Sequence, residues 1–278
     1  MSNDRRDNGW LKIGELPVLR MATIEEVVLH EAHDDERVGR LVERFAADGI
    51  LKNPPVVAPV DGTGRRIVLD GANRMTALKK MGIPHVVVQD IDVLEEGFSL
   101  QSWHHAVEHM QADELLAAAR AVPGFDEFPG AHDDALIRIR FRDGHEVSFR
   151  GSEDLPERVD QLQRFTRIYH RATLFDRVSY TDPGDLERNY PDFTALISFD
   201  PFTMQDLIDA TGAGQLIPSG ITRVILPKRA LRLNLPLDLL RSDLPLDEKE
   251  IRLQEDIRTR VAAKAIRFYR EPTFFFDE

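Results

Sequence analysis

The sequence contains no cysteine among its 278 residues. This absence excludes disulfide bonds, a thiolate nucleophile and cysteine-ligated metal sites together. Long apolar runs are also missing, because no stretch approaches the roughly 20 residues that a membrane-spanning helix requires. The first ten residues are polar and lack the apolar core of a signal peptide. We therefore expect a cytoplasmic protein with no membrane partner.

Positive charge is in the minority in this chain. Lysine and arginine number 36 against 48 aspartate and glutamate residues, which gives a formal net charge of −12. A protein that binds DNA without sequence preference needs a basic surface to displace counterions from the phosphates. The acidic balance argues against DNA as a partner, although a local basic patch is not excluded. The length allows one large domain or two closely packed ones.

Short apolar runs alternate with amphipathic segments along the chain. This pattern predicts an α+β fold, with a mixed-sheet domain over residues 16–108, a tail over 1–15, and a mixed α/β region over 109–278 packed against that domain. Residues 92–116 are predicted to be helical, and most of 110–200 yields no assignment. The other predicted helices cover 37–47, 75–81, 155–175 and 246–269, and the predicted strands cover 24–28, 56–60, 66–69, 86–89, 136–141, 146–150 and 221–226.

The segment Ile67–Ile83 places Asp-Gly at the end of an apolar run, directly before a helix. A helix N-terminus presents unpaired N–H groups and partial positive charge, which together bind phosphate. Gly71 lets the backbone approach a ligand closely, the small Ala72 leaves that approach open, and Arg74 offers a fork of donors to phosphate oxygens. Asp70 would repel a phosphate unless Mg²⁺ lay between them, and Mg²⁺ prefers carboxylate and phosphate ligands.

This interpretation of the turn predicts a site for phosphate and Mg²⁺, with Asp70 as the metal ligand. The alternative is an ordinary helix entry, in which Asp70 and Asn73 cap backbone groups and Arg74 is solvated. Short motifs such as this one match by chance often. The local sequence alone therefore favours the ordinary helix entry.

The turn resembles the phosphate-binding turn of the ParB/sulfiredoxin superfamily. Sulfiredoxin chemistry is excluded, because the position of its catalytic cysteine is Ala72 here. ParB proteins carry a helix-turn-helix that this chain does not show convincingly. Four segments and the run Leu231–Leu237 resemble a third branch, the free L-serine kinases of archaea and of the SbnI-like group. The four segments are Leu29–Glu31, Asp70–Arg74, Ser102–His105 and Pro218–Arg223.

This resemblance implies a ParB/sulfiredoxin-like N-terminal domain that binds nucleotide, and a C-terminal domain that completes a serine site. The implied reaction transfers a phosphoryl group from ATP or ADP to the hydroxyl of L-serine. Its product, O-phospho-L-serine, would serve siderophore or 2,3-diaminopropionate biosynthesis. Glu31 is the implied base and Asp70 the implied Mg²⁺ ligand. The implied phosphate-binding residues are Gly71, Ala72, Asn73, Arg74 and Thr76, and the implied serine-binding residues are Trp103, His105, Thr222 and Arg223.

Three positions depart from the pattern of the kinases. Asn73 replaces the usual histidine, and an amide cannot carry charge, so we expect altered nucleotide binding. Gly220 and Val224 stand where archaeal members tend to have lysine and histidine, and both match the SbnI-like group better. Two alternatives stay open: a ParB-like, nucleotide-responsive DNA-binding regulator without kinase activity, and a kinase for another small hydroxyl compound. The oligomeric state is also open, with a homodimer as the candidate.

Overall fold

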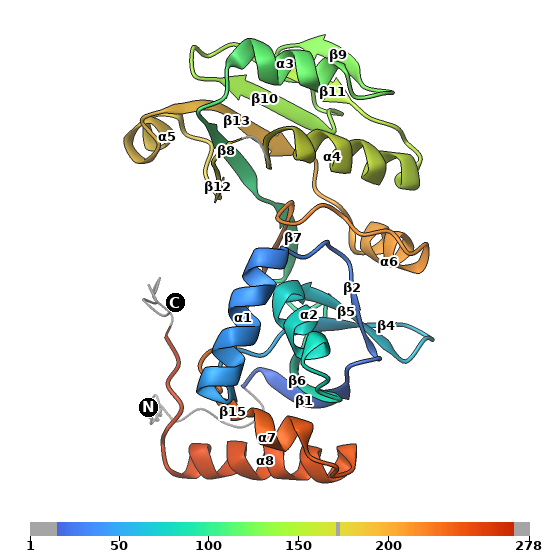
Figure 1. Cartoon of the computed structure of the whole chain (residues 1–278), viewed down its shortest axis with the longest axis vertical. Helices are drawn as coiled ribbons and strands as arrows, with labels where there is room; N and C mark the ends of the chain where they lie inside the picture. Colours follow the sequence, from blue (N-terminus) through green and yellow to red (C-terminus); the bar gives the residue numbers. More distant parts are fainter. Residues whose placement is uncertain (1–15, 171–172, 270–278) are drawn as a thin grey trace, which may run out of the picture.

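Two sheets, one in each of two lobes, form the framework of the protein (Figure 1). The computed structural model describes residues 16–170 and 173–269. The lower sheet is mixed, with strand order β1-β6-β4-β5-β2. Its centre is the predicted hairpin, to which β2 and β6 add in parallel. The strands are β1 (Val18–Thr23), β2 (Val27–Leu29), β4 (Val56–Val60), β5 (Arg65–Asp70) and β6 (His85–Asp90).

The two faces of this lower sheet are both buried, against different partners. Successive side chains of a strand point to opposite faces. Val57 and Val68 therefore join a core with helices α1 (Asp35–Asp48) and α2 (Ala72–Lys80). Their neighbours Ala58 and Ile67 belong to a second core, which continues into the upper lobe. The two lobes are thus joined by shared apolar packing.

Helix α1 begins and ends at residues that suit its termini. The side chain of Asp34 accepts a hydrogen bond from the N–H of Arg37 at 3.0 Å, which caps the N-terminus. Gly49 has a φ of 66° and donates its N–H to the carbonyl of Phe45 at 3.0 Å. This left-handed glycine ends the helix and turns the chain into β3 (Ile50–Leu51).

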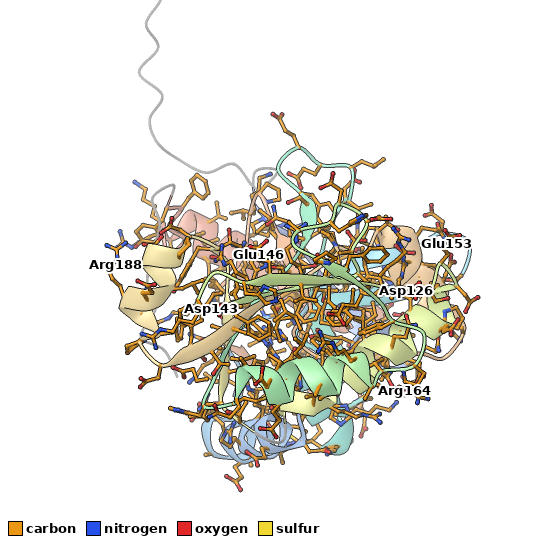
Figure 2. The ribbon with its side chains drawn as sticks, turned by 90° about the horizontal axis from the view of Figure 1, so that it is seen from above. Asp126, Asp143, Glu146, Glu153, Arg164 and Arg188 are labelled. Atoms are coloured by element: carbon orange, nitrogen blue, oxygen red, sulfur yellow. The ribbon has the colours of Figure 1, made fainter. Side chains whose placement is uncertain are left out.

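The upper lobe is an antiparallel sheet with strand order β12-β8-β13-β10-β11-β9. Helices α3 and α4 pack on one face and α5 packs on the other. Figure 2 shows the protein from above, with the labelled charged side chains spread across the view from Arg188 on one side to Glu153 on the other. The elements are β8 (His104–Glu108), α3 (Ala112–Arg120), β9 (Asp126–Pro129), β10 (Ile137–Phe141), β11 (Glu146–Arg150), α4 (Leu155–His170), β12 (Phe175–Val178), α5 (Pro183–Asn189) and β13 (Phe193–Phe199).

The last part of the chain returns from the upper lobe to the lower one. Leu235, Leu240 and Leu253 lie in the same core as α1 and α2. Strand β8, which ends at Glu108, belongs instead to the upper sheet. The two cores therefore do not divide at residue 108, where the sequence suggested a boundary. The remaining elements are β7 (Ser99–Ser102), α6 (Met204–Gly212), β14 (Thr222–Ile225), β15 (Leu235–Pro236), α7 (Leu237–Arg241) and α8 (Leu246–Ala262).

The mixed α/β architecture predicted from the sequence is confirmed, but α4 ends at residue 170 and α8 at residue 262, before the predicted bounds, and one segment was assigned the wrong type. Residues 92–116, predicted to be helical, form β7 and β8 before α3 begins at Ala112. His105, Ala106 and Val107 are all buried, because β8 is an inner strand covered on both faces. Such a strand shows no alternation of polar and apolar residues. Among the described residues, no helix combines the length and apolarity needed to cross a membrane.

Candidate active site

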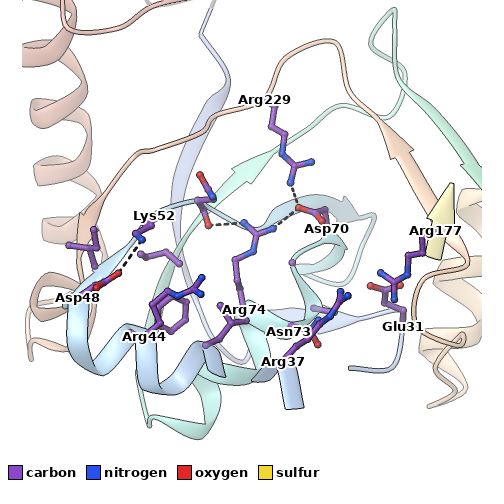
Figure 3. A pocket seen from close by; sticks show the side chains of 17 residues that line it. Glu31, Arg37, Arg44, Asp48, Lys52, Asp70, Asn73, Arg74, Arg177 and Arg229 are labelled. Atoms are coloured by element: carbon purple, nitrogen blue, oxygen red, sulfur yellow. Dashed lines mark hydrogen bonds and ion pairs between the residues drawn. The ribbon is translucent and has the colours of Figure 1, made fainter. Parts of the chain in front are cut away.

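A pocket of about 340 Å³ lies beside the turn that connects β5 to α2 (Figure 3). Its walls come from α1, from β3 and the two residues after it, from the turn itself, and from Glu31, Arg177 and Arg229 of other segments. Arg177 belongs to β12 and therefore comes from the upper lobe. Of the residues predicted from the sequence, the pocket lining includes Glu31, Asp70, Gly71, Ala72, Asn73 and Arg74.

The N-terminus of α2 opens into this pocket without a side-chain cap. Gly71 is the N-cap residue with a φ of 106°, and among the described residues no side chain caps the first turn. This left-handed conformation favours glycine, and a Cβ atom there would also crowd Arg74, at 3.0 Å from its Nη2. The exposed N–H groups and the positive end of the helix dipole favour an anion at this position.

Asp70 and Arg74 form an ion pair, with Nη2 of Arg74 2.5 Å from Oδ2 of Asp70. Arg74 also donates to the carbonyl oxygens of Asn53 at 2.8 Å and Pro54 at 3.2 Å. The guanidinium of Arg229 donates to the same oxygen of Asp70. Burial would raise the pKa of Asp70, but the charges of Arg74 and Arg229 outweigh this effect and lower it. Asp70 is therefore ionised. Arg74 connects the turn to the backbone of Asn53 and Pro54.

A metal at this position would depend on few protein ligands. In the described part of the chain, no group of three or more histidine, aspartate or glutamate side chains could hold a metal ion. Both arginine bonds to Asp70 use Oδ2, which leaves Oδ1 without a hydrogen bond from the described residues. One carboxylate oxygen suits Mg²⁺, which takes the rest of its ligands from phosphates and water.

The backbone on either side of Glu31 is fixed by a bridge to the segment after α6. Ile217 donates its N–H to His30 and accepts the N–H of Ala32, both at 2.8 Å. The side chain of Glu31 then reaches the next residues of that segment. Its Oε2 accepts from the N–H of Gly220 at 3.2 Å and lies 3.5 Å from the hydroxyl of Thr222.

His30 precedes Glu31 in the chain, and only 1% of its surface is exposed. Its Nδ1 contacts the carbonyl oxygen of Val68, and its Nε2 is 2.8 Å from the hydroxyl of Thr222. Burial lowers the pKa of His30, although the neighbouring Glu31 acts in the opposite direction. A neutral ring must carry its proton on Nδ1 to bond Val68, so Nε2 accepts the hydroxyl proton of Thr222.

Thr222 and four other predicted residues do not line the pocket. His105 is fully buried and its Nε2 is 3.0 Å from the carbonyl of Gly220, so it supports the segment that contacts Glu31. Arg223 lies over the ring of Trp103 at 4.8 Å. The hydroxyl of Thr76 donates to the carbonyl of Ala72 within α2. Contacts of these residues with serine or phosphate stay predictions from the resemblance.

Positive charge gathers in the pocket although the chain as a whole is acidic. Six basic and three acidic side chains line the pocket. Five of these basic residues could not be selected from the sequence, because they are spread over α1, the residues after β3, β12 and the segment after β14. Only the fold brings them to one cavity. The five are Arg37, Arg44, Lys52, Arg177 and Arg229.

Comparison with known proteins finds similarity to L-serine kinases. No protein-family model matches the chain. The ATP-dependent L-serine kinase SbnI of Staphylococcus aureus is 25% identical over 209 residues, which are 74% of this chain and 77% of that protein. The predicted resemblance to the free serine kinases is confirmed. An ATP-dependent L-serine kinase of Staphylothermus marinus is 29% identical over 84 residues, 30% of this chain and 33% of that protein.

Solved structures of such kinases share the fold over most of the chain. SbnI with a C-terminal truncation has a TM-score of 0.71 at 21% identity, covering 89% of this chain and 97% of that chain. A free serine kinase in complex with AMP has a TM-score of 0.69 at 12% identity, covering 81% of this chain and 94% of that one. The two-lobed architecture is therefore one that these kinases also have.

Proposed function

We propose that this protein is a free L-serine kinase, which transfers a phosphoryl group to the serine hydroxyl and releases O-phospho-L-serine. One observation carries the proposal. A carboxylate, Glu31, lies in the same pocket as an uncapped helix N-terminus that follows Gly71. The first group can accept a proton and the second can hold phosphate, which are the two requirements of phosphoryl transfer to a hydroxyl. The likeness to named L-serine kinases supports serine as the acceptor.

ATP is the proposed phosphoryl donor. The relatives that support the proposal are named ATP-dependent, and a variant of a free serine kinase of the same fold was solved with ADP. The backbone N–H groups of Ala72 and Asn73 would receive phosphate oxygens at the positive end of α2. Asn73 is partly committed, because its Oδ1 accepts the N–H of Asp34 at 2.9 Å. Its amide N–H₂ group remains as a donor to phosphate.

In the proposed mechanism Glu31 accepts the proton of the serine hydroxyl as its oxygen attacks the terminal phosphorus of ATP. The bond from that phosphorus to the bridging oxygen breaks, and ADP leaves with the electron pair. Phosphoryl transfer needs in-line positioning and charge neutralisation more than covalent help from the protein. The hydrogen bond from Gly220 and the contact with Thr222 orient the carboxylate of Glu31. Arg229 and Arg74 hold Asp70 ionised at the donor end of the pocket.

Asp70 is the residue that would hold Mg²⁺ through its open Oδ1. When bound, the metal would neutralise charge on the phosphates, which Asp70 alone would repel. His105 would act on the serine site through Gly220, and Thr222 through its contact with Glu31. Contacts of Trp103 and Arg223 with the serine remain predictions from the resemblance.

Incubation of the protein with L-serine and Mg²⁺, with ATP or ADP in separate reactions, tests this function. Mass spectrometry should detect O-phospho-L-serine in the ATP reaction. Product from ADP alone would correct the donor while leaving the kinase assignment. If neither nucleotide gives product, the serine kinase assignment is wrong. A gel-retardation assay at two salt concentrations would then test the DNA-binding alternative.

A further inference from the structure

The guanidinium of Arg177 is a partly buried cation on the wall of the pocket. Within the described residues its hydrogen bond is a long one, 3.3 Å from Nη2 to the hydroxyl of Ser219, and no carboxylate forms an ion pair with it. A guanidinium has five N–H donors, so most of them are left for a ligand. Burial lowers the pKa of Arg177, and the nearby charges of Glu31 and Asp34 offset this effect only in part. A bound anion would offset the rest of the cost of removing the cation from water.

Gly220 leaves room for the guanidinium of Arg177 because glycine has no Cβ atom. Gly220 has a φ of 85°, and a Cβ atom there would lie 2.1 Å from Nε and 2.2 Å from Cζ of Arg177. Any other residue at position 220 would displace the guanidinium. Gly220 also donates its N–H to Glu31, so the same residue positions both the proposed base and the guanidinium.

The place of Arg177 in the pocket distinguishes a donor end from an acceptor end. Figure 3 shows Arg177 beside Glu31, while Asp70, Arg74 and Arg229 gather further along the cavity. The donor phosphates belong at the second group, next to the N-terminus of α2. The anion that Arg177 receives therefore belongs to the molecule whose hydroxyl faces Glu31.

We propose that Arg177 binds the carboxylate of the acceptor and thereby selects hydroxyl compounds that carry an acid group. This inference rests on the proposed kinase function and names a specificity determinant of the same site. A guanidinium can bind a carboxylate through two parallel hydrogen bonds, which fixes orientation as well as charge. The contact would hold the hydroxyl of a small amino acid near Glu31. Arg223 is one of the residues to which the resemblance assigned serine binding, so the two arginines are alternatives for this contact.

Arg223 is less well placed for this role. It does not line the pocket, its guanidinium lies over Trp103, and it donates to the side chain of Gln101 at 3.4 Å. The comparison between Arg177 and Arg223 can therefore be made directly by substitution. Arg142, which is exposed in the upper lobe, offers a matched control for loss of a guanidinium.

The test measures steady-state kinetics of Arg177→Met, Arg223→Met and Arg142→Met with two acceptors, L-serine and L-serinamide. Loss of a buried charge-pair partner predicts that Arg177→Met raises the KM for L-serine roughly 30-fold or more. The KM for ATP and the kinetics with L-serinamide, which has no carboxylate, should change less than about twofold. Arg142→Met should match the wild type, and thermal melting would show that each variant is folded.

Three results would overturn the assignment: an Arg177→Met effect on the KM for ATP in place of L-serine, equal effects on both acceptors, or a serine-specific effect of Arg223→Met alone. Calorimetric titration of L-serine separates this inference from the proposed function. If the wild type makes no product but binds L-serine, and Arg177→Met abolishes that binding, the carboxylate site stands without the kinase. If the wild type also fails to bind L-serine, both proposals fall.

Discussion

The imidazole of His30 and the hydroxyl of Thr222 lie 2.8 Å apart, although 192 positions separate them in the chain. This bond connects the residue before Glu31 with the segment that contacts the Glu31 carboxylate. His30 is buried, so water cannot take the place of the Thr222 hydroxyl as the partner of Nε2. The position of the proposed base therefore depends on a contact between two distant segments.

Thr222→Val, which keeps the shape of the side chain, should destabilise the protein. It leaves a buried ring nitrogen without a partner, which costs about 1–3 kcal/mol of unfolding free energy. Urea denaturation measures the change. Thr259→Val removes the hydroxyl of an exposed threonine of α8 and should change stability by less than about 0.5 kcal/mol. Equal effects of the two substitutions would show that the bond between His30 and Thr222 contributes nothing.

Gly220→Ala should impair catalysis more than stability. The added Cβ would displace Arg177, because it would lie only 2.1 Å from Nε of that side chain. Gly144 is the matched control, since it has the same φ of 85° but nothing within 4 Å of an added Cβ. Both variants bear the strain of a left-handed residue, roughly 1–2 kcal/mol.

Kinetic assays with L-serine would separate the clash at Gly220 from this common strain. Gly220→Ala should lower kcat/KM at least about tenfold, and Gly144→Ala should stay within about twofold of the wild type. If the two variants lose the same activity, the space around Gly220 has no role in binding the acceptor.

Lys249 is fully buried and joins α8 to the sheet and to α7. Its ammonium contacts Nδ1 of His85 and the carbonyls of Leu240 and Ser242, each at 2.8 Å. Lys249→Met should lower the unfolding free energy by about 2 kcal/mol or more, because buried acceptors lose their donor. The exposed Lys79→Met should have little effect. A fully stable Lys249→Met protein would contradict this account of how α8 is held.

Acid should destabilise the protein through His105. Burial lowers the pKa of His105 to about 3, while an unfolded chain would have the ordinary value near 6.5. Between these values the unfolded state binds more protons, so stability falls as pH falls from about 6.5 towards 3. The slope from this residue approaches about 1.4 kcal/mol per pH unit.

His105→Gln should make stability less dependent on pH, because glutamine does not titrate. Urea denaturation of both proteins at pH 7.5 and pH 5.5 measures the difference. His30 and His170 also have lowered pKa values and remain in both proteins, so the comparison isolates His105. The same pH slope in the two proteins would contradict a buried, neutral His105.

The sequence predicted the parts of the site that are local. Asp70, Gly71 and the helix that follows could be recognised because strand, turn and helix are adjacent in the chain. Arg177 and Arg229 could not be recognised, because each is an isolated arginine whose role depends on tertiary packing. The sequence could not predict strand β8 for a related reason, since burial on both faces removes the polar alternation that marks a strand.

Glu31→Gln is the substitution that tests the central claim most directly. It keeps size and hydrogen bonding but removes the ability to accept a proton. We predict that kcat for O-phospho-L-serine formation falls by roughly 10²–10⁴-fold, while ATP binding is unchanged. The exposed Glu36→Gln on α1 should retain full activity. Wild-type kcat in Glu31→Gln would contradict the account, because the pocket would then work without its proposed base.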